Sequence, residues 1–61
     1  MASLTSKELT AIEDQLNMEQ MLVKKYKSVA EMTGDPQIKA KCEQIASKHQ
    51  NHYSRLLGHL S

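Results

Sequence analysis

The sequence predicts an all-α protein: a two-helix antiparallel hairpin, two copies of which pack into a four-helix bundle. Apolar residues recur at alternating steps of three and four along two long segments, which is the spacing of a packed helix seam. A single Gly-Asp-Pro run separates the two segments. Each apolar stripe is wider than the seam between two helices requires, and this extra width favours a second copy of the hairpin.

The first helix is expected from about residue 6 to residue 32. Thr5 and Glu8 form the capping-box pattern Thr-x-x-Glu, and Leu4 and Leu9 have the spacing of a hydrophobic staple around that cap. No Gly or Pro occurs between residues 5 and 33 to interrupt the helix. The apolar stripe of this helix consists of Leu9, Ile12, Leu16, Glu19, Val23, Tyr26 and Ala30.

Residues 33–35 are expected to form the turn, and the second helix is expected from about residue 36 to residue 57. Gly34 suits a left-handed helix end because it lacks a Cβ. Asp35 is expected to cap the second helix, with Pro36 in its first position, where a missing N–H costs nothing. Gly58 is expected to begin the end of that helix. A connection this short joins antiparallel neighbours, so residues 1–61 are expected to form a single domain.

A chain of 61 residues has a small core, and such chains often depend on a metal, on disulfides or on a partner subunit. Cys42 is the only cysteine, which excludes an internal disulfide and fits a small apolar core residue in a reducing compartment. Additional apolar residues beside the main stripes favour a homodimer over a monomeric or molten hairpin. These residues are Met18, Met21 and Leu22 in the first helix and Ala46, Tyr53, Leu57 and Leu60 in the second.

The distribution of charge favours one arrangement of the dimer. Lysines gather toward the turn, and acidic residues gather toward the open end of the hairpin. Two hairpins with their turns at opposite ends would set basic halves against acidic halves. Glu19 is near the middle of its helix, so both copies of its layer would meet near the two-fold axis.

Composition and net charge also limit the classes of partner and the cellular location that we expect. The net charge is +1, Trp and Phe are absent, and lysines alternate with acids, so no nucleic acid is expected as a partner. The apolar runs are too short to cross a membrane, and the beginning of the sequence does not resemble a signal peptide. We therefore expect a cytoplasmic protein that is not secreted.

Three polar side chains interrupt the two stripes at one level. Glu19 lies opposite roughly residue 50 when an equal rise is counted along both arms from the turn. The stripe of the second helix consists of Ile38, Cys42, Ile45, His49, His52 and Leu56. Burial of a carboxylate and two imidazoles is costly unless they are paired or bind a metal. Three interpretations follow: a metal site with Glu19, His49 and His52 as ligands, a metal-free polar network, or a layer lined by solvent.

The donor set narrows the choice of metal. His49 and His52 are an i, i+3 pair, so both rings leave the same face of the helix. Imidazole suits Zn, Fe, Cu and Ni, and a carboxylate shifts the preference toward Fe or Mn, so that Zn, Fe and Mn are the candidate cofactors. Di-metal bundles use Glu-x-x-His where this chain has His-x-x-His, which favours a mononuclear site or a nitrogen-rich pair of metal ions over a di-iron oxidase. Gln15, Gln20 and Asn51 are candidates to orient the imidazoles.

Two sequence patterns resemble the Coat F domain of spore-forming Firmicutes. They are Leu16-x-x-Glu19-x-x-x-Val23-x-x-Tyr26 and Lys41-Cys42-x-x-Ile45-x-x-x-His49-x-x-His52-x-x-x-Leu56, with most of the resemblance in the run Lys48-His49-Gln50-Asn51-His52-Tyr53. The resemblance covers about residues 4–60. It implies a ferritin-like helical fold and a structural role in the spore or spore coat, with other coat proteins as partners. Larger members of that family supply a whole bundle from one chain, whereas this chain would supply half.

Two functions from different classes remain as hypotheses. The first is a spore-coat-like structural or interaction protein that forms a homodimeric four-helix bundle. The alternative is a ferritin-like metal-binding protein with a Glu/His site in the bundle core. No Ser-His-Asp arrangement, Gly-rich phosphate loop or zinc-ribbon spacing occurs in the sequence, so a protein without catalytic activity is expected over an enzyme.

Overall fold

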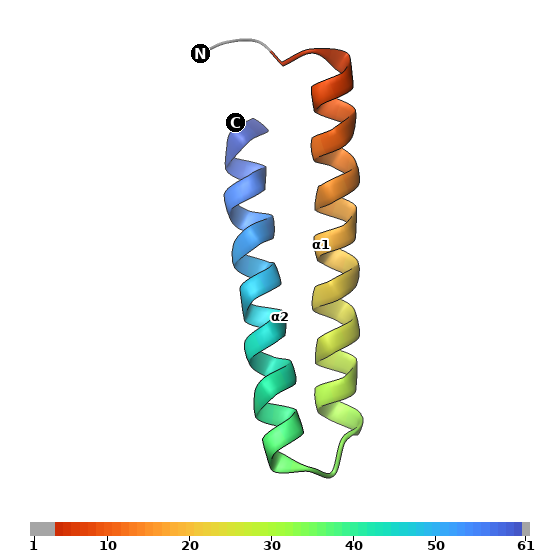
Figure 1. Ribbon diagram of the computed structural model, residues 1–61, viewed down its shortest axis with the longest axis vertical. Helices are drawn as coiled ribbons and strands as arrows, with labels where there is room; N and C mark the ends of the chain where they lie inside the picture. Colours follow the sequence, from red (N-terminus) through yellow and green to blue (C-terminus); the bar gives the residue numbers. More distant parts are fainter. Residues whose placement is uncertain (1–3, 61) are drawn as a thin grey trace.

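The chain is an antiparallel hairpin of two α-helices, as predicted. The computed structural model describes residues 4–60; residues 1–3 and 61 of the expected single domain lie outside that range. Helix α1 spans Ser6–Met32 and helix α2 spans Pro36–Leu57, followed by a 3-10 turn, η1, over Gly58–Leu60. The two helices run side by side from the turn to the open end (Figure 1). Together they form a rod of 47 × 16 × 11 Å.

Helix α1 begins with the capping box that the sequence predicts. The Thr5 hydroxyl oxygen accepts a hydrogen bond from the Glu8 N–H at 3.1 Å, and the Glu8 carboxylate accepts one from the Thr5 N–H at 2.9 Å. These bonds satisfy two of the backbone donors that a helix leaves free at its start. The hydrogen bond from the Thr5 backbone, with a smaller contribution from the Thr5 side chain, also lowers the pKa of Glu8.

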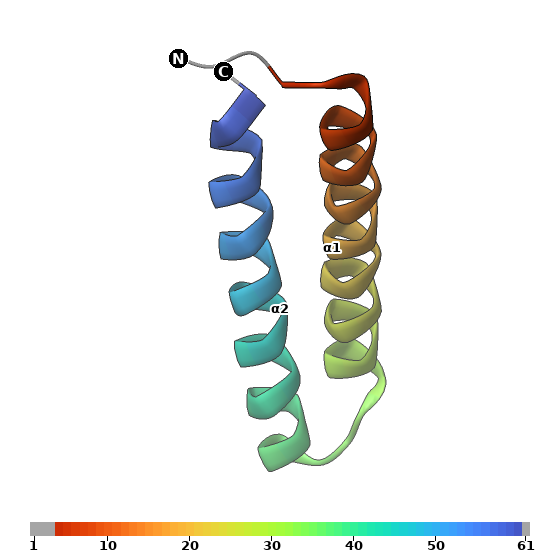
Figure 2. The ribbon, with the colours of Figure 1, turned by 45° about the horizontal axis from the view of Figure 1, so that its top comes forward.

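The prediction that Gly34 adopts a left-handed conformation is wrong. None of the residues from 4 to 60 has a positive φ. Thr33 (φ −78°, ψ 138°) and Asp35 (φ −92°, ψ 115°) are both extended, so the chain reverses through ordinary backbone conformations (Figure 2). The Asp35 N–H donates to the Thr33 hydroxyl oxygen at 3.2 Å. Side-chain acceptors therefore stabilise this turn without the special backbone freedom of glycine.

Helix α2 has the predicted cap. One oxygen of the Asp35 carboxylate accepts hydrogen bonds from the N–H groups of Gln37 and Ile38 at 2.8 and 3.2 Å, and Pro36 occupies the first helical position. At the other end α2 stops at Leu57. Gly58 has right-handed helical angles (φ −59°, ψ −24°) and starts the 3-10 turn.

The core lies along the seam between the two helices. Its buried apolar members are Leu16, Val23, Ala30, Cys42 and Ala46. Cys42 is buried as a reduced thiol, which confirms its expected place as a core residue. No side chain between residues 4 and 60 is completely buried, because two helices alone cannot surround a residue on all sides. Neither helix in this range is long and apolar enough to cross a membrane.

Candidate metal centre

Glu19 is the one charged side chain that is buried among residues 4–60. It lies at the midpoint of α1, and only 7% of its surface is exposed. The uninterrupted helix holds it on the seam one step after Leu16 and one step before Val23, where its neighbours in the sequence pattern are apolar. A carboxylate in such a place needs partners, since its burial is otherwise unfavourable.

Both oxygens of the Glu19 carboxylate have polar neighbours. The Oε1 atom lies 2.6 Å from Nδ1 of His49 on α2. The Oε2 atom accepts a hydrogen bond from the Gln15 amide at 3.3 Å and lies 3.6 Å from Nδ1 of His52. The structure therefore brings together the three residues that the sequence pattern singles out, because the counted level along the two arms matches the actual one.

The aromatic neighbours hold the two imidazole rings at an angle to each other. Tyr26 stacks on His49, with ring centroids 6.3 Å apart and ring planes 15° apart. The His49 and His52 rings meet edge to face, with centroids 5.6 Å apart and planes at 85°. Sequence reasoning missed the contact of Tyr26 with His49; its signal is that Tyr26 follows Glu19 by one heptad in the same stripe.

The site is closed on one side and open on the other. The exposed fraction of the side chain rises from 9% for Glu19 to 24% for His49 and 50% for His52. A pocket of about 210 Å³ adjoins the open side, and its lining residues are Gln15, Glu19, His52, Arg55, Leu56 and His59. The layer is thus neither sealed in the core nor lined by solvent throughout.

The surroundings keep Glu19 ionised. The hydrogen bond with His49 is the largest influence and lowers the pKa of the Glu19 carboxyl. Burial acts in the opposite direction, while the Gln15 amide and the charges on the two imidazoles lower the pKa further. The net shift is downward, so the carboxylate stays an acceptor and a competent metal ligand at neutral pH.

The three side chains lie close enough together to share one metal ion once their rotamers adjust. One ligand atom from each of Glu19, His49 and His52 lies within 4.8 Å of the others. Around a tetrahedral ion with bonds of about 2.0–2.1 Å, ligand atoms are about 3.3 Å apart. His49 Nδ1 lies 2.6 Å from one oxygen of the Glu19 carboxylate and His52 Nδ1 lies 3.6 Å from the other, so an ion held by a single oxygen requires the side chains to rotate.

The residues that we considered for orienting the imidazoles have different places. Gln15 contacts Glu19, as described above. Gln20 instead donates a hydrogen bond to the Tyr53 hydroxyl at 3.2 Å, and Asn51 is exposed. Gln15 is therefore the residue of the three that touches the cluster, and it does so through the carboxylate.

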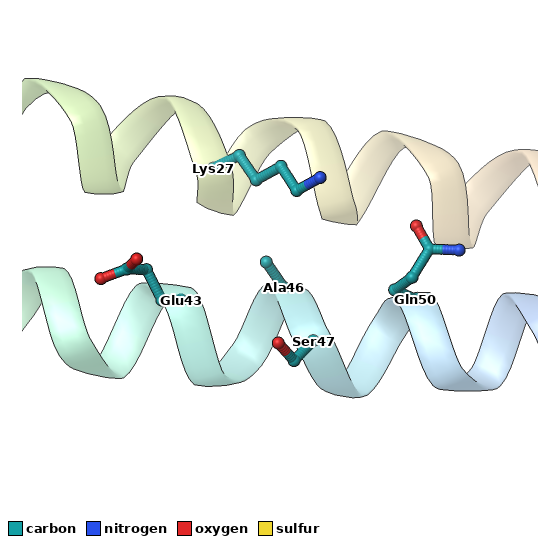
Figure 3. Close-up of a pocket in the computed structure, with 5 residues that line it drawn as sticks. All are labelled: Lys27, Glu43, Ala46, Ser47 and Gln50. Carbon is teal, nitrogen blue, oxygen red and sulfur yellow. The ribbon is translucent and has the colours of Figure 1, made fainter.

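A separate pocket of about 250 Å³ lies between α1 and α2, away from these ligands. Lys27 reaches into it from α1, while Glu43, Ala46, Ser47 and Gln50 line it from α2 (Figure 3). It has no histidine and shares no residue with the Glu19 cluster. We assign no function to this pocket.

Comparisons with known protein families, with curated proteins and with solved structures found no match. The resemblance to the Coat F domain stays a prediction from the residues quoted above.

Proposed function

We propose that this protein binds a divalent transition-metal ion through Glu19, His49 and His52. The observation that carries the proposal is that one ligand atom from each of Glu19, His49 and His52 lies within 4.8 Å of the others. Glu19 is the buried charged residue among residues 4–60. Two imidazoles and one carboxylate suit zinc, iron or manganese. Three protein ligands also leave at least one coordination position for another group.

The position of His52 favours a metal over a simple polar network. A hydrogen bond accounts for His49, whose Nδ1 lies 2.6 Å from Glu19, and another accounts for Gln15. The 3.6 Å between His52 Nδ1 and Glu19 Oε2 is too long for a hydrogen bond. A shared ion would give His52 a direct bond in the cluster, whereas a metal-free network gives its ring only the 3.6 Å polar contact with Glu19 and the edge-to-face contact with His49.

A structural role is the second candidate, and the incomplete core favours it. No side chain between residues 4 and 60 is fully buried, and large apolar side chains such as Met18, Met21 and Ile38 are exposed. A homodimeric, ferritin-like four-helix bundle would cover them. The resemblance to the Coat F domain supports a place for this dimer in the cytoplasm of a sporulating cell or in the spore coat, with other coat proteins as partners. The two candidates are compatible, because a bundle can hold a metal in its core.

Metal content tests the first proposal. The protein should be purified from cells grown separately with added zinc, iron or manganese, dialysed against a weak chelator, and measured by elemental analysis. We expect close to one ion per chain for the wild type and almost none for Glu19→Gln, since an amide oxygen is a much poorer ligand than a carboxylate. Leu16, one step earlier on the same stripe, offers no ligand atom, so Leu16→Ile, which also adds none, serves as the matched control and should retain the ion. Wild-type protein without stoichiometric metal from any of the three cultures would refute the proposal.

A further inference from the structure

The open side of the Glu19 cluster is continuous with a second apolar stripe on α1. This stripe has alternating steps of four and three, like the main seam. Its members are Ala11, Gln15, Met18, Leu22, Lys25, Val29 and Met32. Gln15 belongs to the stripe and also lines the pocket beside His52. The stripe, which we call the methionine face, therefore runs along the side of the hairpin on which the cluster is open.

The other side of the hairpin is more polar. It is marked by the hydrogen bond between Gln20 on α1 and Tyr53 on α2. The row of α1 that contains Gln20 also includes Glu13 and Lys27, at steps of seven. Leu57 follows Tyr53 by one turn and lies on this side. Met18 and Leu22 of α1 therefore lie on one side of the hairpin, and Tyr53 and Leu57 of α2 lie on the other.

The surface area of the chain is too large for a compact monomer. The accessible surface is 4943 Å², whereas a compact monomer of this mass has about 4,000 Å². The excess of about 900 Å² is close to the roughly 800 Å² that each partner loses in a standard protein interface. The radius of gyration, 14.5 Å, is also that of a compact domain of about 140 residues, about twice this length. A standard interface with one further copy would cover an area of about this size.

The methionine face is complementary to itself when two copies run antiparallel. In a two-fold interface, positions at equal distances on either side of the axis lie opposite each other. With the axis near residue 20, Met18 faces Leu22 of the second copy and Ala11 faces Val29, which are apolar pairs, and the polar Gln15 faces Lys25. Asp14 and Lys25 are also close to equidistant from residue 20, so opposite charges meet beside the apolar pairs.

The overall charge supports the same orientation. Residues 20–48 contain six lysines and three acidic residues. The rest of the chain, with Glu19 set aside, contains two basic residues, Lys7 and Arg55, and three acidic ones, Glu8, Glu13 and Asp14. Antiparallel packing sets each basic half against an acidic half, while parallel packing would set the two basic halves together.

We propose that a second copy of this chain packs antiparallel on the methionine face, with the two-fold axis near residue 20 of α1, and closes the open side of the Glu19, His49 and His52 cluster. The axis lies one residue from Glu19, so the two clusters face each other at the same level. The half-exposed His52 side chain, which the single chain leaves open, becomes covered by the partner. The closure of a metal site rests on the proposed function, whereas the dimer face does not.

Sedimentation of charge-introducing variants tests the face. The wild type should sediment as a dimer at micromolar concentration, and Met18→Glu should raise the dimer dissociation constant at least about 30-fold. Leu57→Glu is the matched control on the opposite side, because Leu57 is 44% exposed and Met18 is 54% exposed. It should change the constant less than about threefold. A monomeric wild type, or a Leu57→Glu variant that dissociates as readily as Met18→Glu, would overturn the proposal.

A cross-link tests the orientation even if Met18→Glu fails to fold. In a Cys42→Ala background, Ala11→Cys and Val29→Cys place two thiols about 27 Å apart on one straight helix, too far for a disulfide within the chain. Mild oxidation should give a covalent dimer of the double variant, while Ala11→Cys alone should stay uncross-linked. Equal cross-linking of the single variant, or none of the double variant, would refute the antiparallel arrangement.

Zinc titrations separate this inference from the proposed function. Because the partner excludes water from the cluster, the monomeric Met18→Glu variant should bind Zn²⁺ at least about tenfold more weakly than the dimer, while Leu57→Glu should match the wild type. Equal zinc affinity of monomer and dimer would overturn the closure of the site and leave the metal site intact. Absence of zinc binding by every variant, with the dimer and its cross-link intact, would refute the metal site and its closure and leave the dimer face standing.

Discussion

Replacement of His52 by glutamine should abolish the stabilisation of this protein by metal while hardly changing the stability of the metal-free protein. The His52 side chain is 50% exposed, and its Nδ1 atom, 3.6 Å from Glu19, makes no hydrogen bond there. Without metal, its loss breaks no hydrogen bond in the cluster, and glutamine keeps a polar side chain there, so the free energy of unfolding should change by less than about 1 kcal/mol even where a second copy covers this position.

With metal the expected effect is several times larger. An ion present at one hundred times its dissociation constant stabilises the folded state by about 2.7 kcal/mol. For a domain of this size that amounts to a rise in Tm of about 11–22 °C. The His52→Gln variant loses one of three ligands, so the same zinc concentration should raise its Tm only slightly.

Thermal unfolding followed by circular dichroism, with excess zinc or with chelator, measures both quantities at one fixed chain concentration. His59→Gln is the matched control, because His59 lines the same pocket but is not a member of the cluster. It should keep the full zinc-induced rise in Tm. The reasoning fails if His52→Gln keeps that rise, or if His59→Gln loses it.

Three further predictions concern the loss of stability at low pH and the residues of the turn between the helices. The pKa of Glu19 is lowered below its ordinary value of 4.5, chiefly by His49, so the unfolded chain binds more protons at this carboxyl than the folded chain. The contribution of Glu19 to stability is therefore complete above about pH 4.5 and is lost as the pH falls through the lowered pKa. Urea unfolding of the metal-free protein should accordingly show a steeper loss of stability below pH 4.5 in the wild type than in Glu19→Gln, and equal slopes would contradict the assignment. Gly34→Ala should raise the free energy of unfolding by about 0.4–1 kcal/mol, because Gly34 has no positive φ and an added Cβ would meet nothing within 4 Å; a loss of stability in urea would indicate a left-handed turn after all. Asp35→Ala should lower the free energy of unfolding by about 1 kcal/mol, or the Tm by about 4–8 °C, because it removes the acceptor for two backbone N–H groups. Gln37→Ala, which leaves the Asp35 acceptor in place, should differ from the wild type by less than about 0.5 kcal/mol, and an equal loss in both variants would argue against the cap.

Local signals predicted the hairpin well because each acts within a few residues. The capping box of Thr5 and Glu8 and the cap by Asp35 form from side chains and backbone groups no more than three residues apart. Gly34 shows the limit of such reasoning. A glycine before a helix permits a left-handed conformation, but the backbone needs it only if the path of the turn demands it, and here extended residues reverse the chain.

The gathering of Glu19, His49 and His52 could also be predicted, because equal rise along two straight antiparallel helices places them at one level. The roles of their individual atoms could not. Glu19 forms a short contact with His49 and a longer one with His52, and the difference depends on rotamers and on the stacking of Tyr26 against one ring. Helical period does not contain that information.

The sequence by itself determined the two helices, their caps and the level at which a carboxylate meets two imidazoles, since these follow from short-range hydrogen bonding and a regular rise per residue. Only the tertiary structure decided which side of the hairpin leaves the cluster open and which apolar residues share that side. Those features depend on the rotation of each helix about its own axis, which is set when side chains pack across the seam between α1 and α2.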